Sequence, residues 1–210
     1  GMTMAETGNI EGIDAITYWV LDKAVSAALD LQERGSILQI SVNLSAWMVD
    51  QPGLISNVSE VVRGRNFDCS QLTFEVTETF SMANREMAKR NLLDLRAMGF
   101  HLSIDDFGTG QASLAYLSEI PSDEIKMDKR FVQAIVGSMR DRAIVANTVQ
   151  LAHALGQTIV AEGVEDRATL DVLRTLGCDL AQGYFIGKPI AYHDFVASLD
   201  LGQQRRIRYG

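Results

Sequence analysis

Short apolar segments rich in β-branched residues alternate along the chain with longer segments of helical periodicity. The apolar segments predict six strands, at 37–42, 72–76, 101–104, 123–127, 157–161 and 179–183. Between them, apolar residues recur every three or four positions and predict helices at 15–34, 54–65, 85–99, 142–156 and 168–177. Asp14 is the expected N-cap of the first helix. This alternation predicts a parallel sheet covered by helices.

An open doubly wound sheet and a (β/α)8 barrel both fit this order of elements. The position of polar residues distinguishes them, because every predicted strand carries a polar residue at or near its carboxyl end. These residues are Asn43, Glu75, Asp105, Asp106, Lys126, Glu162 and Gln182. In a barrel all the carboxyl ends meet at one mouth, whereas in an open sheet only those near a switch point do. The pattern therefore favours an incomplete TIM-like (β/α) barrel with about six of the eight strands.

The chemistry of this set points to hard cations. It contains carboxylates and amides but no cysteine or histidine, and such oxygen ligands suit Mg²⁺ or Mn²⁺ better than Zn²⁺. The adjacent carboxylates of Asp105 and Asp106 repel each other unless cations neutralise them, and one aspartate can bridge two ions. Two ions roughly 3.5–4 Å apart would activate a water and stabilise the leaving oxygen of a phosphodiester. Lys126 would orient that water or meet a phosphate oxygen.

Each residue also has a simpler interpretation when it is taken alone. An aspartate pair after a strand is commonly an N-cap with a solvated neighbour, and a single Lys126 or Gln182 is commonly a surface residue. Glu75 is harder to explain in this way, because an unpaired carboxylate in a buried strand is costly. The coincidence of all the strand ends favours a site.

Composition and charge limit the classes of partner. The chain has 210 residues, 47% of them hydrophobic, which suits one domain with a substantial core. A net charge of −8 argues against binding long nucleic acid, but not against a small anion held through metal ions. The sequence shows no membrane segment and no signal peptide. Cys69 and Cys178 lie outside any CxxC pattern, so we expect small apolar side chains in a reducing cytoplasm.

Six segments of the chain carry recognisable motifs: "VNLSAWM" (42–48), "LTFEVTET" (72–79), "IDDFGTGQASLAYL" (104–117), "IKMDKRFV" (125–132), "VAEGVED" (160–166) and "GCDLAQGYFIGKPI" (177–190). Taken together, they resemble the EAL domain family, bacterial phosphodiesterases that hydrolyse cyclic di-GMP to the linear dinucleotide pGpG. The resemblance covers nearly the whole chain, in family order and spacing.

The resemblance implies a role for each polar residue. It implies a first metal on Asn43, Glu75 and Asp105, and a second on Asp105, Asp106 and Glu162. It implies that Lys126 acts on the attacking water, with Asp105 and Glu162 also catalytic. Contacts with the nucleotide are implied for Gln182, Gly108 and Gly110, and support of the loop after Asp106 is implied for Glu78.

The chain departs from the family pattern at its amino-terminal side. The Glu-Ala-Leu triplet that names the family is absent, and its glutamate is a ligand of the first metal. We therefore expect one domain at 2–203 that lacks the first two strands, with a tail at 204–210. Hydrolysis should then be impaired, and the alternatives are a cyclic di-GMP receptor or a protein-interaction module. The two strands beside the gap would expose unpaired edges, which predicts a homodimer that covers the opening.

Overall fold

A computed structural model shows a parallel six-stranded sheet whose strands follow one another in chain order. The structure describes residues 4–77, 84–108 and 120–202, and the side chains of residues 15–77, 84–108 and 120–199. The strands are β1 Ile40–Asn43, β2 Leu72–Thr77, β3 His101–Phe107, β4 Glu124–Met127, β5 Thr158–Ala161 and β6 Leu180–Ala181. A doubly wound sheet would interrupt the sequential order, so the predicted incomplete barrel is confirmed as a half-barrel.

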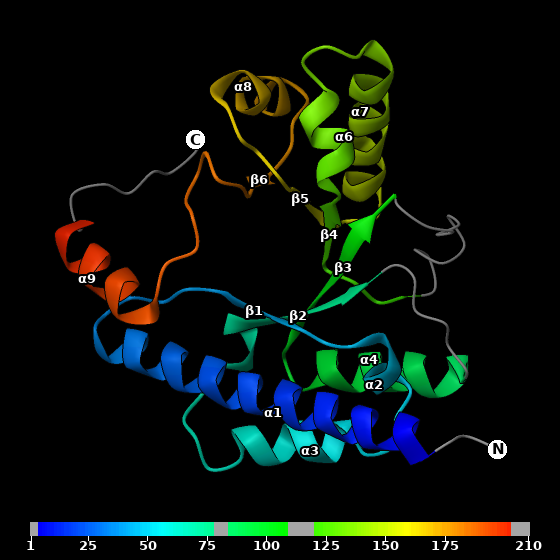
Figure 1. The fold of residues 1–210 in the computed structure, drawn as a ribbon, viewed down its shortest axis with the longest axis vertical. Coiled ribbons are helices and arrows are strands. Elements are labelled where there is room, and N and C mark those ends of the chain that lie inside the picture. The colour runs from blue at the N-terminus through cyan, green and yellow to red at the C-terminus, as the bar shows by residue number, and fades with distance from the viewer. Residues whose placement is uncertain (1–3, 78–83, 109–119, 203–210) are drawn as a thin grey trace.

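Helices cover the outer face of this half-barrel in two groups (Figure 1). The first group and a short 3-10 turn comprise α1 Met4–Glu33, α2 Ala46–Val49, α3 Leu54–Val62, η1 Cys69–Gln71 and α4 Arg85–Ala97. The second group comprises α6 Lys129–Ala134, α7 Met139–Ala154 and α8 Arg167–Thr175, and α9 Tyr192–Gly202 follows. None of the helices in the described part of the chain has the length and apolar character needed to cross a membrane.

Two features of the helices differ from the sequence prediction. Helix α1 begins at Met4, so Asp14 lies inside the helix and is not its N-cap. The apolar periodicity that begins at residue 15 reports only the part of a helix that packs, and the helix continues beyond that part. Helices α2, α6 and α9 were not predicted. For α2 and α6 the reason is that segments of 4 and 6 residues are too short to show a period.

The hydrophobic core lies between the outer face of the sheet and the helices. Phe74, Leu102, Ile125 and Ile159 alternate with inward-facing residues along their strands and are fully buried. The ring of Phe74 meets that of Phe100 edge-on, with the centroids 5.0 Å apart. Each such side chain contributes about 1.5–3 kcal/mol by leaving water. This packing holds the strands in register and so sets where their carboxyl ends lie.

Both cysteines are free and partly buried at the edge of this core. Burial raises the pKa of the Cys178 thiol to about 11. The thiol therefore stays protonated near neutral pH, as expected of a packing residue.

The inner face of the sheet is polar, unlike the packed apolar interior of a complete barrel. Thr73, Glu75, Ser103 and Lys126 are all buried there. Beside them lies a cavity of about 840 Å³, which is lined by residues of β1, β6 and the chain that follows β6. The cavity occupies the open side of the half-barrel, because β1 and β6 are the two end strands of the sheet.

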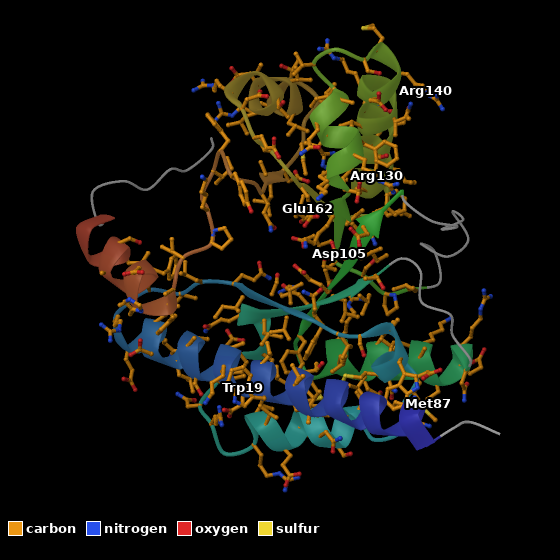
Figure 2. All side chains as sticks on the ribbon, viewed as in Figure 1. Trp19, Met87, Asp105, Arg130, Arg140 and Glu162 are labelled. Carbon is orange, nitrogen blue, oxygen red and sulfur yellow. The ribbon has the colours of Figure 1, made fainter. Side chains whose placement is uncertain are left out.

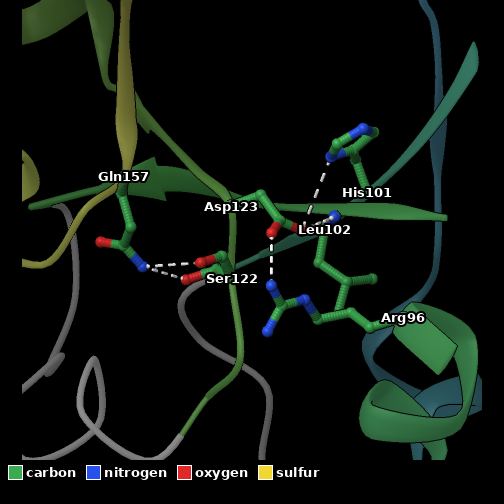
Figure 3. A network of polar contacts seen from close by, with 6 residues as sticks. All are labelled: Arg96, His101, Leu102, Ser122, Asp123 and Gln157. Carbon is green, nitrogen blue, oxygen red and sulfur yellow. Dashed lines mark hydrogen bonds and ion pairs between the residues drawn. The ribbon is translucent and has the colours of Figure 1, made fainter. Parts of the chain in front are cut away.

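A network of polar contacts ties the strands together at their amino-terminal ends (Figure 3). The carboxylate of Asp123, just before β4, accepts a hydrogen bond from the Leu102 backbone N–H of β3 at 2.9 Å. It also accepts one from the Arg96 guanidinium at 2.7 Å. Asp179, before β6, repeats the arrangement: it accepts from the Ile159 N–H of β5 at 2.9 Å and lies 3.0 Å from His153 Nε2.

We expect Asp123→Ala to lower the free energy of unfolding by about 1–3 kcal/mol, because it leaves a backbone N–H and a guanidinium without their acceptor. Urea denaturation followed by circular dichroism would measure the change. Asp94→Ala is the matched control, since the ion pair of Asp94 with Arg90 on α4 is exposed and long, at 3.9 Å. Equal effects of the two substitutions would contradict the assigned role of Asp123.

Candidate functional site

The predicted site residues lie at the carboxyl edge of the sheet. Asn43 ends β1 and is the register partner of Glu75 on β2, while Thr77 of β2 pairs with Asp105 on β3. Lys126 is the third residue of β4, and Glu162 and Gln182 directly follow β5 and β6. Since all strand pairs are parallel, these residues share one end of the sheet.

The Lys126 ammonium is at the centre of this group. Its Nζ lies 2.7 Å from Glu162 Oε1, 3.1 Å from Glu75 Oε2 and 3.2 Å from Asp105 Oδ1. The lysine side chain is only 6% exposed. Burial by itself lowers the pKa of Lys126, but the hydrogen bond with Glu162 and the charges of Glu75 and Asp105 outweigh it and raise the pKa above its ordinary value. We therefore expect Lys126 to be protonated near neutral pH.

A local irregularity brings the adjacent aspartates together. Consecutive side chains of a regular strand point to opposite faces of the sheet, which would separate Asp105 from Asp106. The β3–β4 register shifts between Ile104 and Phe107, and Asp106 has a left-handed φ of 55°. Carboxylate oxygens of Asp105, Asp106 and Glu162 consequently all lie within 4.8 Å of one another. Figure 2 shows Asp105 and Glu162 in this region.

The electrostatics and donor types of this cluster fit a hard divalent cation. Burial, followed by the charges of Asp105 and Asp128, raises the pKa of Asp106. Burial also raises the pKa of Glu162, although its hydrogen bond with Lys126 acts in the opposite direction. Carboxylates held this close together are disfavoured as anions, and a cation among them removes the penalty. The all-oxygen set of Asp105, Asp106 and Glu162 could hold such an ion.

Of the four remaining predicted residues, the structure describes Gln182 and Gly108. Gln182 lines the 840 Å³ cavity together with Glu75 and Lys126. Gly108 follows β3 with φ +95°, and a Cβ at this position would lie 2.8 Å from the Phe131 ring, so the turn requires glycine. Glu78 and Gly110 lie outside the described residues.

Two acidic residues near the site were not among those predicted. Asp128, which follows β4, is buried and lies within hydrogen-bonding distance of Asp106, while its Oδ1 accepts from the Arg130 N–H at 2.8 Å. Its position directly after a strand was the signal that could have identified it. Glu124 is two residues before Lys126 on the inward-facing side of β4, and burial raises its pKa. Strand alternation alone would have placed Glu124 on the inner face.

The half-barrel with an acidic carboxyl mouth defines a class of α/β domain, and the comparisons with known proteins identify its family. The family model described as the EAL domain matches residues 3–189. The chain is 38% identical over 185 residues to the bifunctional diguanylate cyclase/cyclic di-GMP phosphodiesterase MucR of Pseudomonas aeruginosa. The aligned region covers 88% of this chain and 27% of MucR. It is 32% identical to the cyclic di-GMP phosphodiesterase RocR of the same organism, over 91% of this chain and 48% of that protein.

Solved structures agree with the sequence comparisons. The P. aeruginosa MucR phosphodiesterase in complex with c-di-GMP has a TM-score of 0.80 at 37% identity, covering 91% of this chain and 76% of that chain. The EAL domain of Mycobacterium smegmatis DcpA has a TM-score of 0.81 at 31% identity, covering 89% and 85%. The chain belongs to the EAL domain family. It spans less than half the length of the curated relatives MucR and RocR.

We expect Asp106→Asn to raise the melting temperature of the metal-free protein and to reduce the further rise that Mg²⁺ causes. The folded-state pKa of Asp106 is raised, so its ionised form disfavours folding above the unfolded pKa of about 4. The gain from asparagine should therefore grow as the pH rises above about 4. Asparagine also tolerates the left-handed backbone at this position.

Thermal denaturation at several pH values, with EDTA or MgCl₂, would measure both effects of Asp106→Asn. Asp171→Asn, at an exposed position of α8, is the matched control and should change neither. A loss of metal-free stability in Asp106→Asn, at every pH, would contradict the charge assignment.

Proposed function

We propose that this chain is a metal-dependent cyclic di-GMP phosphodiesterase domain. The observation that carries the proposal is the cluster of Asp105, Asp106 and Glu162 around the carboxyl mouth of an EAL-family half-barrel, with Lys126 in contact with two of them. Cyclic di-GMP has two phosphodiester groups and is anionic. An acidic mouth on a chain of net charge −8 would repel it unless cations neutralise the carboxylates.

The proposed roles follow the chemistry of each group. Asp105, Asp106 and Glu162 would hold one Mg²⁺ or Mn²⁺, and Asn43, Glu75 and Asp105 the other. Two such ions, when bound, supply a nucleophilic water and charge stabilisation of the leaving oxygen. Lys126, as a fixed ammonium, would orient the water or contact a phosphate oxygen by donating a hydrogen bond. Gln182, Gly108 and Gly110 would contact the nucleotide, and Glu78 would support the loop after Asp106.

A second candidate function is binding without cleavage. The sequence contains no Glu-Ala-Leu triplet, so the glutamate that this triplet would contribute to the first metal has to be supplied from elsewhere. The proposed first metal set, Asn43, Glu75 and Asp105, then has one anionic ligand fewer than in the family pattern. The proposed second set, Asp105, Asp106 and Glu162, keeps all its ligands. Two-metal hydrolysis needs both ions, but binding mainly needs charge neutralisation in a concave mouth. Hydrolysis should thus be more impaired than binding.

We expect cyclic di-GMP binding by this chain to require Mg²⁺ or Mn²⁺ and to weaken about tenfold or more in Asp105→Asn, which removes a carboxylate shared by both metal sets. Calorimetry with and without EDTA would measure the affinity. Asp171→Asn on α8 is the charge-matched control. Binding that persists in EDTA with unchanged affinity would contradict a role for metal in the site.

Hydrolysis by this chain should be slow or absent, and should rise when a segment that carries the Glu-Ala-Leu triplet is joined ahead of residue 2. Chromatography of the nucleotide products, with Mg²⁺ or Mn²⁺, would compare the two chains. Brisk formation of pGpG by the chain alone would show that the triplet glutamate is dispensable. Binding without turnover by both chains would support a receptor, and neither binding nor turnover would support an interaction module.

The open side of the half-barrel supports a homodimer. β1 and β6 each have a strand neighbour on one side only among the described strands. Apolar side chains are exposed beside the two edges: Ile37 is 72% exposed, Leu180 50%, Tyr184 65% and Ile190 55%. Unpaired edges and apolar surface of this kind favour association with another chain. We propose that a second copy covers this side.

Light scattering across the micromolar range should therefore show a dimer, and Leu180→Lys in β6 should shift the protein towards monomer. A charged residue on a strand edge opposes pairing with another strand. Leu155→Lys, at a similarly exposed leucine beyond the end of α7, is the matched control and should leave association unchanged. A monomer at all concentrations would rule out the proposed dimer.

A further inference from the structure

The Lys126 ammonium forms ion pairs with carboxylates at the ends of three different strands. Glu75 comes from β2, Asp105 from β3, and Glu162 from the residue after β5, and their oxygens lie 3.1, 3.2 and 2.7 Å from Nζ. Lys126 thereby links three strand ends that carry like charges.

This arrangement answers an electrostatic problem that the fold itself creates. Parallel strands bring the carboxylates of Glu75, Asp105 and Glu162 to one small region, where the side chains are only 9%, 14% and 21% exposed. In such surroundings an uncompensated negative charge is costly, and several near one another are more costly. A buried cation that touches all three reduces the repulsion.

Two of the carboxylates that pair with Lys126 are also carboxylates that a divalent cation would need. Asp105 and Glu162 belong, with Asp106, to the cluster whose ligand atoms lie within 4.8 Å of one another. The ammonium and a metal ion would both be positive and would share the same carboxylates. Each therefore weakens the hold of the cluster on the other.

We propose that Lys126 is the built-in counter-ion of this site, which stabilises the fold without metal and sets the metal affinity by competing for Asp105 and Glu162. This inference rests on the proposed metal site. It adds a function to Lys126 beyond any contact with water or phosphate. In this view a metal ion enters a cluster in which Lys126 already pairs with Asp105 and Glu162. Metal binding therefore has to weaken these ion pairs.

The test is Lys126→Met, which keeps an unbranched apolar side chain and removes the charge. In EDTA at pH 7.5 we expect its melting temperature to fall by roughly 6–15 °C, as for other buried ion pairs that lose one partner. Mg²⁺ should restore most of this loss, and Mn²⁺ titrated by calorimetry should bind about tenfold tighter than to the unmodified chain. Lys126→Arg, which keeps the charge, should remain close to the unmodified protein in EDTA.

Lys89→Met is the control for loss of a lysine, because Lys89 is exposed on α4. If Lys126→Met is unfolded in EDTA and folds when Mg²⁺ is added, the inference is supported. If it has unchanged metal-free stability, or binds Mn²⁺ no more tightly, the inference is wrong. If Lys126→Met folds neither in EDTA nor with Mg²⁺, the stability of Lys126→Arg in EDTA is the deciding measurement. A large loss of metal-free stability in Lys126→Arg would overturn the charge argument. Failure of Mg²⁺ and Mn²⁺ to bind the unmodified chain would instead refute the proposed metal site.

Discussion

The ion pairs of Lys126 with Glu75, Asp105 and Glu162 connect the fold to its chemistry. A parallel sheet places the carboxyl ends of its strands at one edge, and in this chain those ends carry several acidic groups. The same geometry that brings together carboxylates able to hold a cation therefore generates repulsion that the fold must offset. Lys126 stands on β4, between β3 and β5 in the sheet, and from there it can reach carboxylates on both sides.

The two ends of the sheet are used differently. At the amino-terminal end, Asp123 and Asp179 accept hydrogen bonds from backbone N–H groups of the neighbouring strands, and these contacts fix the strands to one another. At the carboxyl end, polar side chains face the mouth and backbone irregularity is tolerated, as at Asp106. This division is that of a TIM-like barrel, in which one end provides stability and the other chemistry.

The polar inner face distinguishes this domain from a closed barrel packed with apolar side chains. Thr73 and Ser103 are buried on it, and the cavity beside them reaches from β1 to the chain after β6. The open side thus joins the proposed site to the outer edges of β1 and β6, which have no strand neighbour among the described residues. Association at those edges would alter the surroundings of Gln182 and Lys126, which line the same cavity. The proposed assembly would therefore be physically connected to the proposed ligand binding.

Much of the fold and part of the site could be predicted from the sequence. The apolar runs located all the strands, and the polar residues after them indicated a common mouth, because strand alternation and parallel pairing are local, repeating rules. Short helices such as α2 and α6 escaped prediction because they have no period to detect. The start of α1 was also wrong, since the apolar pattern reports packing and not helix length.

The sequence by itself determined which residue types reach the mouth: Asn43, Glu75, the aspartate pair, Lys126, Glu162 and Gln182. Only the tertiary structure decided how they meet. The register shift and the left-handed Asp106 turn two neighbours towards one cluster, and Asp128 joins them from the position just after β4. The tertiary structure also brings Glu75, Asp105 and Glu162 to Lys126. Such distances depend on strand register, on the local bulge and on the packing of distant helices, none of which is encoded by spacing along the chain.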